Sequence, residues 1–162
     1  MTQEKTMTTE LVGDRGIVMT RMFSAPRRLV FKAYSDCDHL NQWWGPRLWP
    51  LSYCDLDFRP GGTWHYCMRG PNGEEAWGKA IYREIVEPES LVYADAFSDA
   101  EGSTVPPESV VWVTFGDEGK KTRLTVRTEF ATAEDRETVL KMGAEEGIAE
   151  TLDRLEELLA TL

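Results

Sequence analysis

The C-terminal stretch from Thr132 to Leu162 constrains the fold most, because it reads as one long amphipathic helix. After Phe130 the two-residue alternation of apolar and polar side chains stops, and apolar residues recur at steps of three and four. The apolar stripe consists of Leu140, Ala144, Ile148, Thr151, Leu152, Leu155, Leu159 and Leu162. We therefore predict about eight helical turns that pack through this stripe on the rest of the chain.

Two glycines, Gly143 and Gly147, stand beside this stripe. Each costs roughly 1 kcal/mol in a helix interior, so each needs a reason. One explanation is close packing of the helix on a sheet, and the other is a ligand cavity beneath the helix. For Gly143 we predict the cavity, so that Gly143→Ala should stabilise the free protein. If the site is already filled, the added methyl group should instead cost about 1–3 kcal/mol.

Seven segments ahead of the helix have the composition or the alternation of β-strands. In the last of them Leu124, Val126, Thr128 and Phe130 alternate with polar residues, which predicts one buried and one wet face. Turn sequences rich in Gly, Pro and Asn separate the segments. The predicted strands are residues 15–23, 51–58, 63–69, 75–86, 91–97, 109–115 and 122–130.

Two short helices are predicted between the first strand and the second. Pro26 suits the first position of a helix over residues 27–34. Asp36 is a good cap for a second helix, which ends near Trp43 or Trp44. Strands followed by a closing helix indicate an α+β fold, in which a curved antiparallel sheet of about seven strands surrounds the long C-terminal helix.

Length and charge limit the class of protein. A chain of 162 residues suits a single domain, which we place at residues 15–162 after a polar, flexible arm at residues 1–14. The net charge of −10 repels phosphate backbones, so we expect no nucleic-acid partner. No run approaches the roughly 20 apolar residues of a membrane span. The N-terminal residues lack the apolar core of a signal peptide, so we expect no membrane contact and a cytoplasmic location.

Three cysteines, an odd number, predict free thiols in a reducing compartment. The hydrophobic pattern of the first hairpin selects a register that pairs Phe58 with Trp64. In this register Cys54 points inward and Cys67 points outward, so we expect no bridge between them.

Motifs for metal binding and nucleophilic catalysis are missing from the sequence. The two histidines, His39 and His65, lie far apart, and no Cys-x-x-Cys pair occurs. Neither a nucleophile elbow nor a glycine-rich phosphate loop ahead of a helix is present. We therefore expect no metal and no cofactor.

Aromatic residues are the remaining functional signal. The chain holds six Trp, five Tyr and six Phe, more Trp and Tyr than a core of this size requires. An aromatic core is one explanation. The other is a mostly apolar cavity with a few polar tips, which is the usual composition of a small-molecule site.

Five segments, taken in order, carry a more specific signal: FSAPRRLVFKAYSDCDHLNQWWGP, DFRPGGTWHYCMRGPNGEE, WGKAIYREIVEPESLVYADAFSD, KTRLTVRTEF and MGAEEGIAETLDRLEELL. Together they resemble the bacterial activator of heat shock protein 90 ATPase homologues, over about Arg15 to Leu162. That family belongs to the START-like (SRPBCC) superfamily, which includes polyketide cyclases. The resemblance implies a helix-grip fold, with a cavity between the sheet and the C-terminal helix. It also implies a cavity lining that includes Trp44, Trp64, Tyr66, Met68, Trp112, Met142 and Gly143.

Three functions follow as hypotheses. We favour a module that binds a small hydrophobic or aromatic ligand in the cavity, without catalysis. The first alternative is a cyclase-like or hydrolytic enzyme, which an inward titratable group without a partner would favour, for instance Glu84, Asp95 or Arg21. The second alternative follows from the family name and its link to the stress response: a chaperone partner that contacts the acidic surface. A homodimer is also left open as a partner.

Overall fold

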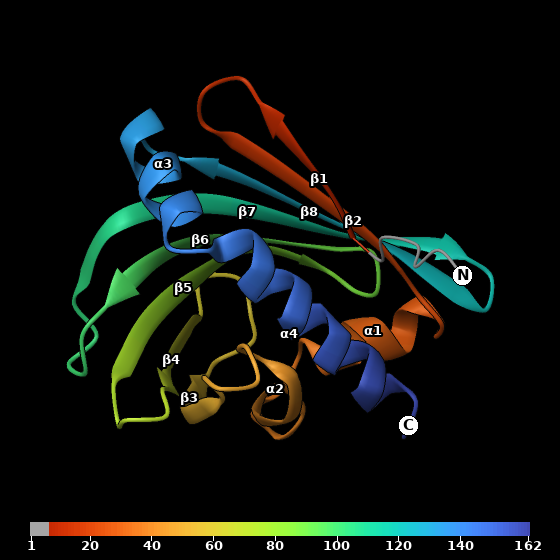
Figure 1. Cartoon of the computed structure of the whole chain (residues 1–162). Coiled ribbons are helices and arrows are strands. Elements are labelled where there is room, and N and C mark those ends of the chain that lie inside the picture. The colour runs from red at the N-terminus through yellow and green to blue at the C-terminus, as the bar shows by residue number, and fades with distance from the viewer. Residues whose placement is uncertain (1–6) are drawn as a thin grey trace, which may run out of the picture.

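The computed structural model describes residues 7–162 and arranges them as one antiparallel sheet with helices on its concave side (Figure 1). The strands lie in the order β1-β2-β8-β7-β6-β5-β4-β3. Their bounds are β1 Met7–Val12, β2 Gly16–Phe23, β3 Leu51–Leu56, β4 Thr63–Arg69, β5 Glu75–Val86, β6 Ser90–Ser98, β7 Thr104–Glu118 and β8 Lys121–Phe130. The helices are α1 Arg27–Ala33, α2 Cys37–Trp43, α3 Ala133–Lys141 and α4 Ala144–Leu159.

The C-terminal helix α4 organises this arrangement. In Figure 1 the sheet curves behind α4, α2 lies below this helix, α1 lies behind its C-terminal half, and α3 lies near its start. The predicted α+β fold with a helix-grip arrangement is confirmed. The cap that we predicted at Asp36 is also present, because its carboxylate accepts a hydrogen bond of 2.8 Å from the backbone N–H of His39.

The core lies between the concave face of the sheet and the helices α1, α2 and α4. Strand β7 shows why the chain folds this way, since Val111, Val113 and Phe115 alternate with more exposed residues and are almost fully buried. The ring of Phe115 meets the rings of Phe31 and Tyr34 of the α1 segment edge to face, with 5.3 Å between centroids in both pairs. Burial of these aromatic rings attaches the helices to the sheet.

Helix α4 has two halves that differ in burial. The half from Thr151 to Leu159, which we call the packed half, buries its inward side chains, and Leu155 is 0% exposed. The half from Ala144 to Glu150, the open half, has only partly buried or exposed residues, including the inward Ile148. The core is therefore complete under the packed half and incomplete under the open half.

The prediction of one continuous helix from Thr132 to Leu162 is wrong. Helix α3 ends at Lys141, and Gly143 adopts φ +82°, a left-handed conformation that ends one helix and starts the next. An L side chain is strained at this φ whatever space surrounds it. Our expectation that Gly143→Ala stabilises the protein is therefore reversed.

The N-terminal residues hold an eighth strand. Residues 7–12 form β1, which pairs with β2 from Met7 opposite Arg21 to Val12 opposite Gly16. The flexible arm that we predicted for residues 1–14 is thus wrong for this segment, and residues 1–6 lie outside the described part. Strand β1 escaped prediction because it is a largely exposed edge strand with little apolar alternation.

The hairpin between β3 and β4 has a different register from the predicted one. Leu56, and not Phe58, lies opposite Trp64. The difference arises because the chain leaves β3 at Leu56, so Phe58 belongs to the turn that precedes β4.

Two of the three cysteines form a disulfide, contrary to the prediction of free thiols. Cys37 of α2 is bonded to Cys54 of β3, which ties the helical layer to the edge of the sheet. Cys67 is a free thiol, and it is fully buried although it alternates away from the core. Its cross-strand neighbours Tyr53 and Trp77 explain this burial, because their rings meet at 5.5 Å over that face.

Between residues 7 and 162 no helix combines the length and the apolar character needed to cross a membrane.

Candidate functional site

Four of the predicted site residues come together at one edge of the concave face. The ring centroids of Trp44 and Trp64 lie 4.7 Å apart, those of Trp64 and Tyr66 lie 4.3 Å apart, and Trp44 lies 6.0 Å from Tyr66. Met68, two residues further along β4, packs against the same core cluster. These residues, which we call the aromatic wall, come from the loop after α2 and from β4.

Helix α4 holds the loop that carries Trp44. The guanidinium of Arg154 donates hydrogen bonds to the backbone carbonyls of Gln42 (3.1 Å), Trp44 (3.3 Å) and Gly45 (2.7 Å). The Gln42 carbonyl belongs to the last turn of α2 and the other two follow it, where acceptors lack partners within the helix. One wall of the site is therefore fixed to the packed half of α4.

Small side chains lie on the concave face next to the aromatic wall. In one row across the strands Trp64 is followed by Ala80, Asp95 and Ser109. In the row beside it the ring of Tyr66 lies across Gly78, where any Cβ would collide with the phenol. The backbone positions of Trp64 and Asp95 are thus two strand spacings apart, about 9–10 Å, with Ala80 between them.

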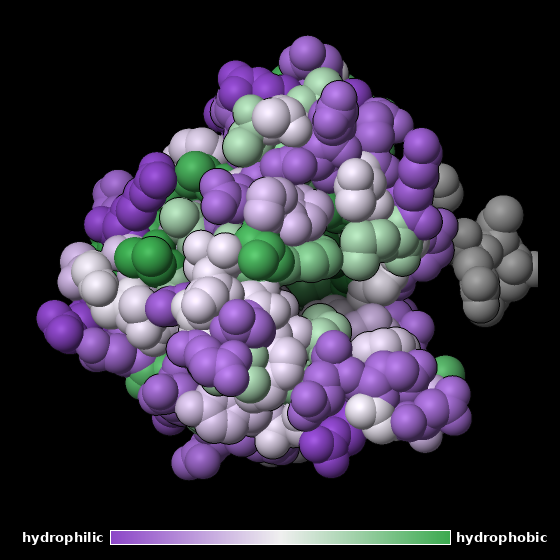
Figure 2. All heavy atoms as spheres, turned by 90° about the vertical axis from the view of Figure 1, so that its left-hand side faces the viewer, coloured by the Kyte–Doolittle hydropathy of each residue, from purple (hydrophilic) through white to green (hydrophobic). Residues whose placement is uncertain are grey.

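Inward side chains that remain partly exposed reveal a space between the sheet and the open half of α4. Trp44, Met68, Asp95, Ser109 and Ile148 all belong to the concave face or to the elements over it, yet each is only half-buried. Figure 2 shows a hollow near the middle of the face that lies on the left in Figure 1, with hydrophobic residues at its rim and in its depth. The site is therefore an open-ended hollow with an aromatic wall.

Asp95 is the titratable group of this hollow. It alternates with the buried Leu91 and Tyr93 on β6, so its side chain faces the helices. Burial raises the pKa of its carboxyl from 3.8 to about 7, and a hydrogen bond from the backbone of Ala96 opposes this rise. Within residues 7–162 no Lys, Arg or His forms an ion pair with it.

Three tyrosines surround this carboxyl. Tyr66, Tyr82 and Tyr93 are 8%, 3% and 7% exposed, and burial followed by the nearby Asp95 charge raises the pKa of each hydroxyl. No hydrogen bond to these hydroxyls is made within the described residues. The indole Nε1 of Trp64 is also buried and has no partner there. Of these polar groups, the Trp64 Nε1 is the one that is both fully buried and without a hydrogen-bond partner among the described residues.

The other titratable groups that we considered are placed differently. Glu84 is exposed. Arg21 is buried, but its guanidinium forms an ion pair of 2.9 Å with Asp153. Asp95 is the one of the three that is both inward and without a charged partner among the described residues. No cluster of His, Cys, Asp or Glu in the described part is arranged to hold a metal ion.

Three predicted lining residues lie away from the hollow. Trp112 alternates with the buried Val111 and Val113, so it faces the outer side of the sheet, where it contacts the guanidinium of Arg127 at 5.3 Å. The side chain of Met142 is 62% exposed, because the chain turns at this point from α3 to α4. Gly143 forms that turn. The parity of β7 and the break between the helices explain these differences.

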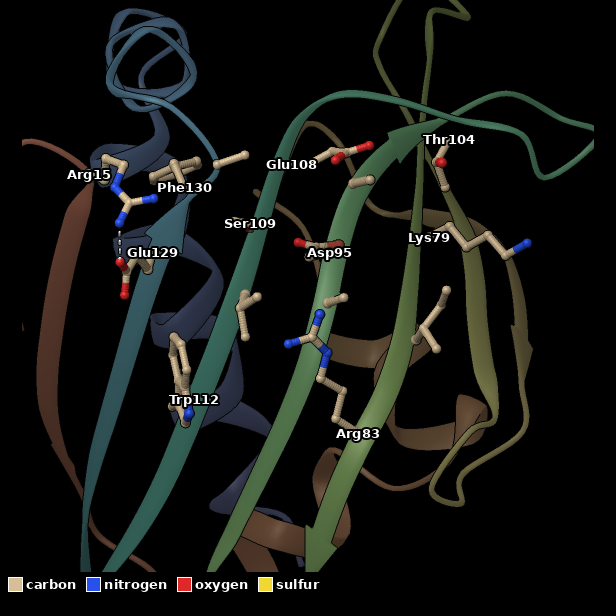
Figure 3. Close-up of a pocket in the computed structure, with 15 residues that line it drawn as sticks. Arg15, Lys79, Arg83, Asp95, Thr104, Glu108, Ser109, Trp112, Glu129 and Phe130 are labelled. Carbon is tan, nitrogen blue, oxygen red and sulfur yellow. Dashed lines mark hydrogen bonds and ion pairs between the residues drawn. The ribbon is translucent and has the colours of Figure 1, made fainter.

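The outer side of the sheet has a hollow of its own, of about 470 Å³. Figure 3 shows this outer hollow with α4 behind the strands, so that Arg83 and Trp112 lie on the side of the sheet that faces the viewer. Lys79 and Glu129 also line it, and Glu129 forms an ion pair of 2.9 Å with Arg15. Its charges are mixed, and Asp95 and Ser109 also border it, although both alternate onto the concave face of their strands. The concave hollow differs because it combines aromatic rings with the buried, unpartnered Nε1 of Trp64.

Comparisons with known proteins agree with this fold. The structures similar to this chain include a crystal structure of protein Ms6760 from Mycobacterium smegmatis, which is 32% identical, with 95% of this chain and 97% of that chain covered and a TM-score of 0.86. A solution structure of a protein from Arthrobacter aurescens is 26% identical, with coverage of 96% and 92% and a TM-score of 0.89. The AHSA1 protein SPO3351 from Silicibacter pomeroyi is 25% identical, with coverage of 90% and 98% and a TM-score of 0.74.

A comparison with curated protein sequences finds no match. The family model described as "Activator of Hsp90 ATPase homolog 1-like protein" matches residues 24–160, which include the aromatic wall, Asp95 and α4. The chain therefore belongs to the Activator of Hsp90 ATPase homolog 1-like family.

Proposed function

We propose that this protein binds a small, mostly apolar or aromatic molecule in the hollow between the concave face of the sheet and the open half of α4. The ligand would lie against the aromatic wall formed by Trp44, Trp64, Tyr66 and Met68. Its polar end would reach Asp95 and the tyrosine hydroxyls. The observation that carries this proposal is the buried indole Nε1 of Trp64, which has no hydrogen-bond partner among the described residues and lies among nearly buried aromatic side chains.

The energetics favour an occupant for this hollow. A buried donor or acceptor without a partner costs about 1–3 kcal/mol, which a ligand with matching groups would recover. Sites for small molecules are usually apolar and aromatic, with a few polar groups that orient the ligand. Because Arg154 fixes the loop of Trp44, the wall does not have to be assembled when the ligand arrives.

The proposal is tested by binding measurements with a panel of small neutral aromatic compounds, followed by calorimetry and thermal shift. Two variants distinguish binding in the concave hollow from binding elsewhere on the surface. Ile148→Trp should fill the space under the open half and abolish binding. Trp112→Phe, on the outer face of the sheet, should leave the affinity unchanged. Binding that survives Ile148→Trp but is lost in Trp112→Phe would move the site to the outer hollow.

One observation supports a catalytic use of the same hollow as a second candidate function. A carboxyl with a pKa of about 7 holds and releases protons near neutral pH, as a general acid or base must. In a cyclase-like or hydrolytic reaction Asp95 would transfer a proton to or from the bound substrate. Once a ligand is identified, product analysis with the native protein and with Asp95→Asn would decide, since unchanged ligand in both reactions speaks for binding alone.

A chaperone partner is a further proposal, supported by the family relationship and the net charge of −10. Association through the acidic surface would weaken with salt. A pull-down with the host's heat shock protein 90 homologue at low and high salt tests this association. Absence of binding at low salt would contradict the proposal.

A further inference from the structure

The ligand chemistry of the concave hollow can be narrowed further. We propose that its ligand is a hydrophobic amine, whose protonated nitrogen pairs with the carboxylate of Asp95 while its apolar body lies against Trp44, Trp64 and Tyr66. This inference rests on the proposed function of the hollow, to which it adds the class of the ligand.

The Asp95 carboxyl has no counter-ion within the described residues. Asp95 faces the helices, and within the described residues no Lys, Arg or His pairs with its carboxyl. Buried charges in proteins are normally paired, because an unpaired charge is costly to remove from water. A ligand cation would supply the partner that the described chain does not. The net charge of −10 also raises the local concentration of cations over that of anions.

Aromatic side chains lie near the Asp95 carboxyl and continue to the aromatic wall. Tyr66, Tyr82 and Tyr93 lie around the carboxyl, and the rings of Tyr82 and Tyr93 are 5.9 Å apart. Ring faces attract organic cations, and the attraction grows when the site excludes water. Trp64 and Tyr66 extend the same surface to the aromatic wall, with 4.3 Å between their rings. An ammonium group with an apolar tail therefore finds a complementary surface along its whole length.

The ionisation of Asp95 gives the proposal a measurable pH dependence. Its pKa of about 7 is set by burial, and the titratable groups coupled to it are Tyr66, Tyr82 and Tyr93, all of which stay neutral at this pH because burial raises the pKa of each hydroxyl. The carboxyl therefore changes from mostly neutral at pH 6 to mostly ionised at pH 8. An alkylamine remains protonated over this range, so its affinity should rise by up to about tenfold between these pH values.

A neutral ligand would behave in the opposite way. If the protonated carboxyl donated a hydrogen bond to a ligand carbonyl or hydroxyl, affinity would fall as the pH rises from 6 to 8. The direction of the pH dependence thus distinguishes the two ligand classes without knowledge of the natural ligand.

The experiment uses two probes of equal size, 2-phenylethylamine and 2-phenylethanol, with calorimetric titrations of the full chain at pH 6 and pH 8. We expect the amine to bind at least about tenfold more tightly than the alcohol at pH 8. Asp95→Asn should remove this preference while leaving the affinity for the alcohol unchanged. Glu84→Gln removes an equal charge at an exposed position, so it should preserve the preference.

Carbon-detected NMR of the native protein adds a readout that needs no variant. Saturation with 2-phenylethylamine should lower the apparent pKa of the Asp95 carboxyl, whereas 2-phenylethanol should leave it or raise it. Equal affinities for the two probes, or a preference for the amine that survives in Asp95→Asn, would overturn the amine proposal and leave the proposed binding function intact. Failure of both probes and of every neutral panel compound to bind would overturn both.

Discussion

The two halves of α4 cover the same sheet but differ in how completely their inward side chains are buried. Under the packed half the inward leucines lose almost all contact with solvent, and Leu155 is 0% exposed. Under the open half the inward Ile148 remains partly exposed, and Asp95 and Ser109 of the concave face are also only half-buried. One helix therefore completes the core at one end and leaves a hollow at the other. The difference places the stabilising contacts in the packed half and the proposed ligand site under the open half, so substitutions in the two halves should have different effects.

The largest effect should come from removal of side-chain volume in the packed half. Leu155→Ala should lower the free energy of unfolding by about 2–5 kcal/mol, because it leaves a cavity among fully buried neighbours. Ile148→Ala in the open half should cost only about 1 kcal/mol, since its side chain borders space that already exists. Urea denaturation of both variants measures the contrast. Equal losses would mean that the two halves are equally well packed.

Loss of the disulfide should have the next largest effect. The bond between Cys37 and Cys54 closes a loop with a sequence separation of 17 residues. In the chain-entropy view its removal costs about 3 kcal/mol. We therefore expect the double variant Cys37→Ser, Cys54→Ser to unfold at a clearly lower urea concentration than the native protein. Addition of a reductant should lower the stability of the native protein and leave the double variant unchanged; an equal effect on both would contradict this.

Asp95→Asn should stabilise the protein at pH 8 but not at pH 4. Near pH 4 the Asp95 carboxyl is protonated in the folded chain and is protonated in a large fraction of the unfolded chains. As the pH rises to 7, the carboxyl ionises first in the unfolded chain, because its pKa is lower there. The free energy of unfolding therefore falls over this range. A fully buried carboxyl with this pKa would cost roughly 4 kcal/mol at pH 8. Partial exposure reduces this, and we expect about 2 kcal/mol.

Denaturation curves of Asp95→Asn and of the native protein at both pH values provide the measurement. Glu84→Gln is the matched control, because it removes an exposed carboxylate from the neighbouring strand β5. A pH-independent difference between Asp95→Asn and the native protein would show that the Asp95 carboxyl is not buried.

The smallest effects concern the two glycines, and they should differ in sign. Gly143→Ala should destabilise the protein by about 1–2 kcal/mol, because alanine is strained at φ +82°. At Gly147 an added Cβ would make an ordinary contact with Pro46 at 3.6 Å, so Gly147→Ala should gain up to about 1 kcal/mol of helix propensity. Thermal unfolding of both variants tests this. A loss in Gly147→Ala would mean that the loop of Pro46 cannot tolerate the methyl group.

Sequence reasoning was sufficient where one periodicity extended over a whole element. The alternation of β8 and the stripe of α4 predicted the fold class, and the aromatic residues of β4 led to one wall of the hollow. Sequence reasoning failed where a single residue determines whether a helix continues or ends. The turn at Gly143 interrupts a stripe that otherwise reads as continuous, although a glycine after Lys141 is a common signal for the end of a helix.

The other differences have three separate causes. Trp112 was assigned to the cavity by resemblance, yet its alternation with Val111 and Val113 already places it on the outer face. The partner of Cys54 could not be found from spacing, because Cys37 reaches it only after α2 has folded against β3. The importance of Asp95 also depended on the structure, since the absence of a charged partner is visible only in three dimensions.

The contacts of Arg154 have a consequence for the kinetics of the proposed ligand binding. Its three hydrogen bonds attach the Trp44 loop to the half of α4 that should be the last to open. Local opening of a protein proceeds in cooperative units, and the least stable units exchange most often. The aromatic wall would then stay in place while the open half of α4 and α3 fluctuate. A ligand would then enter and leave by movement of α3 and the open half of α4, while the aromatic wall keeps its position.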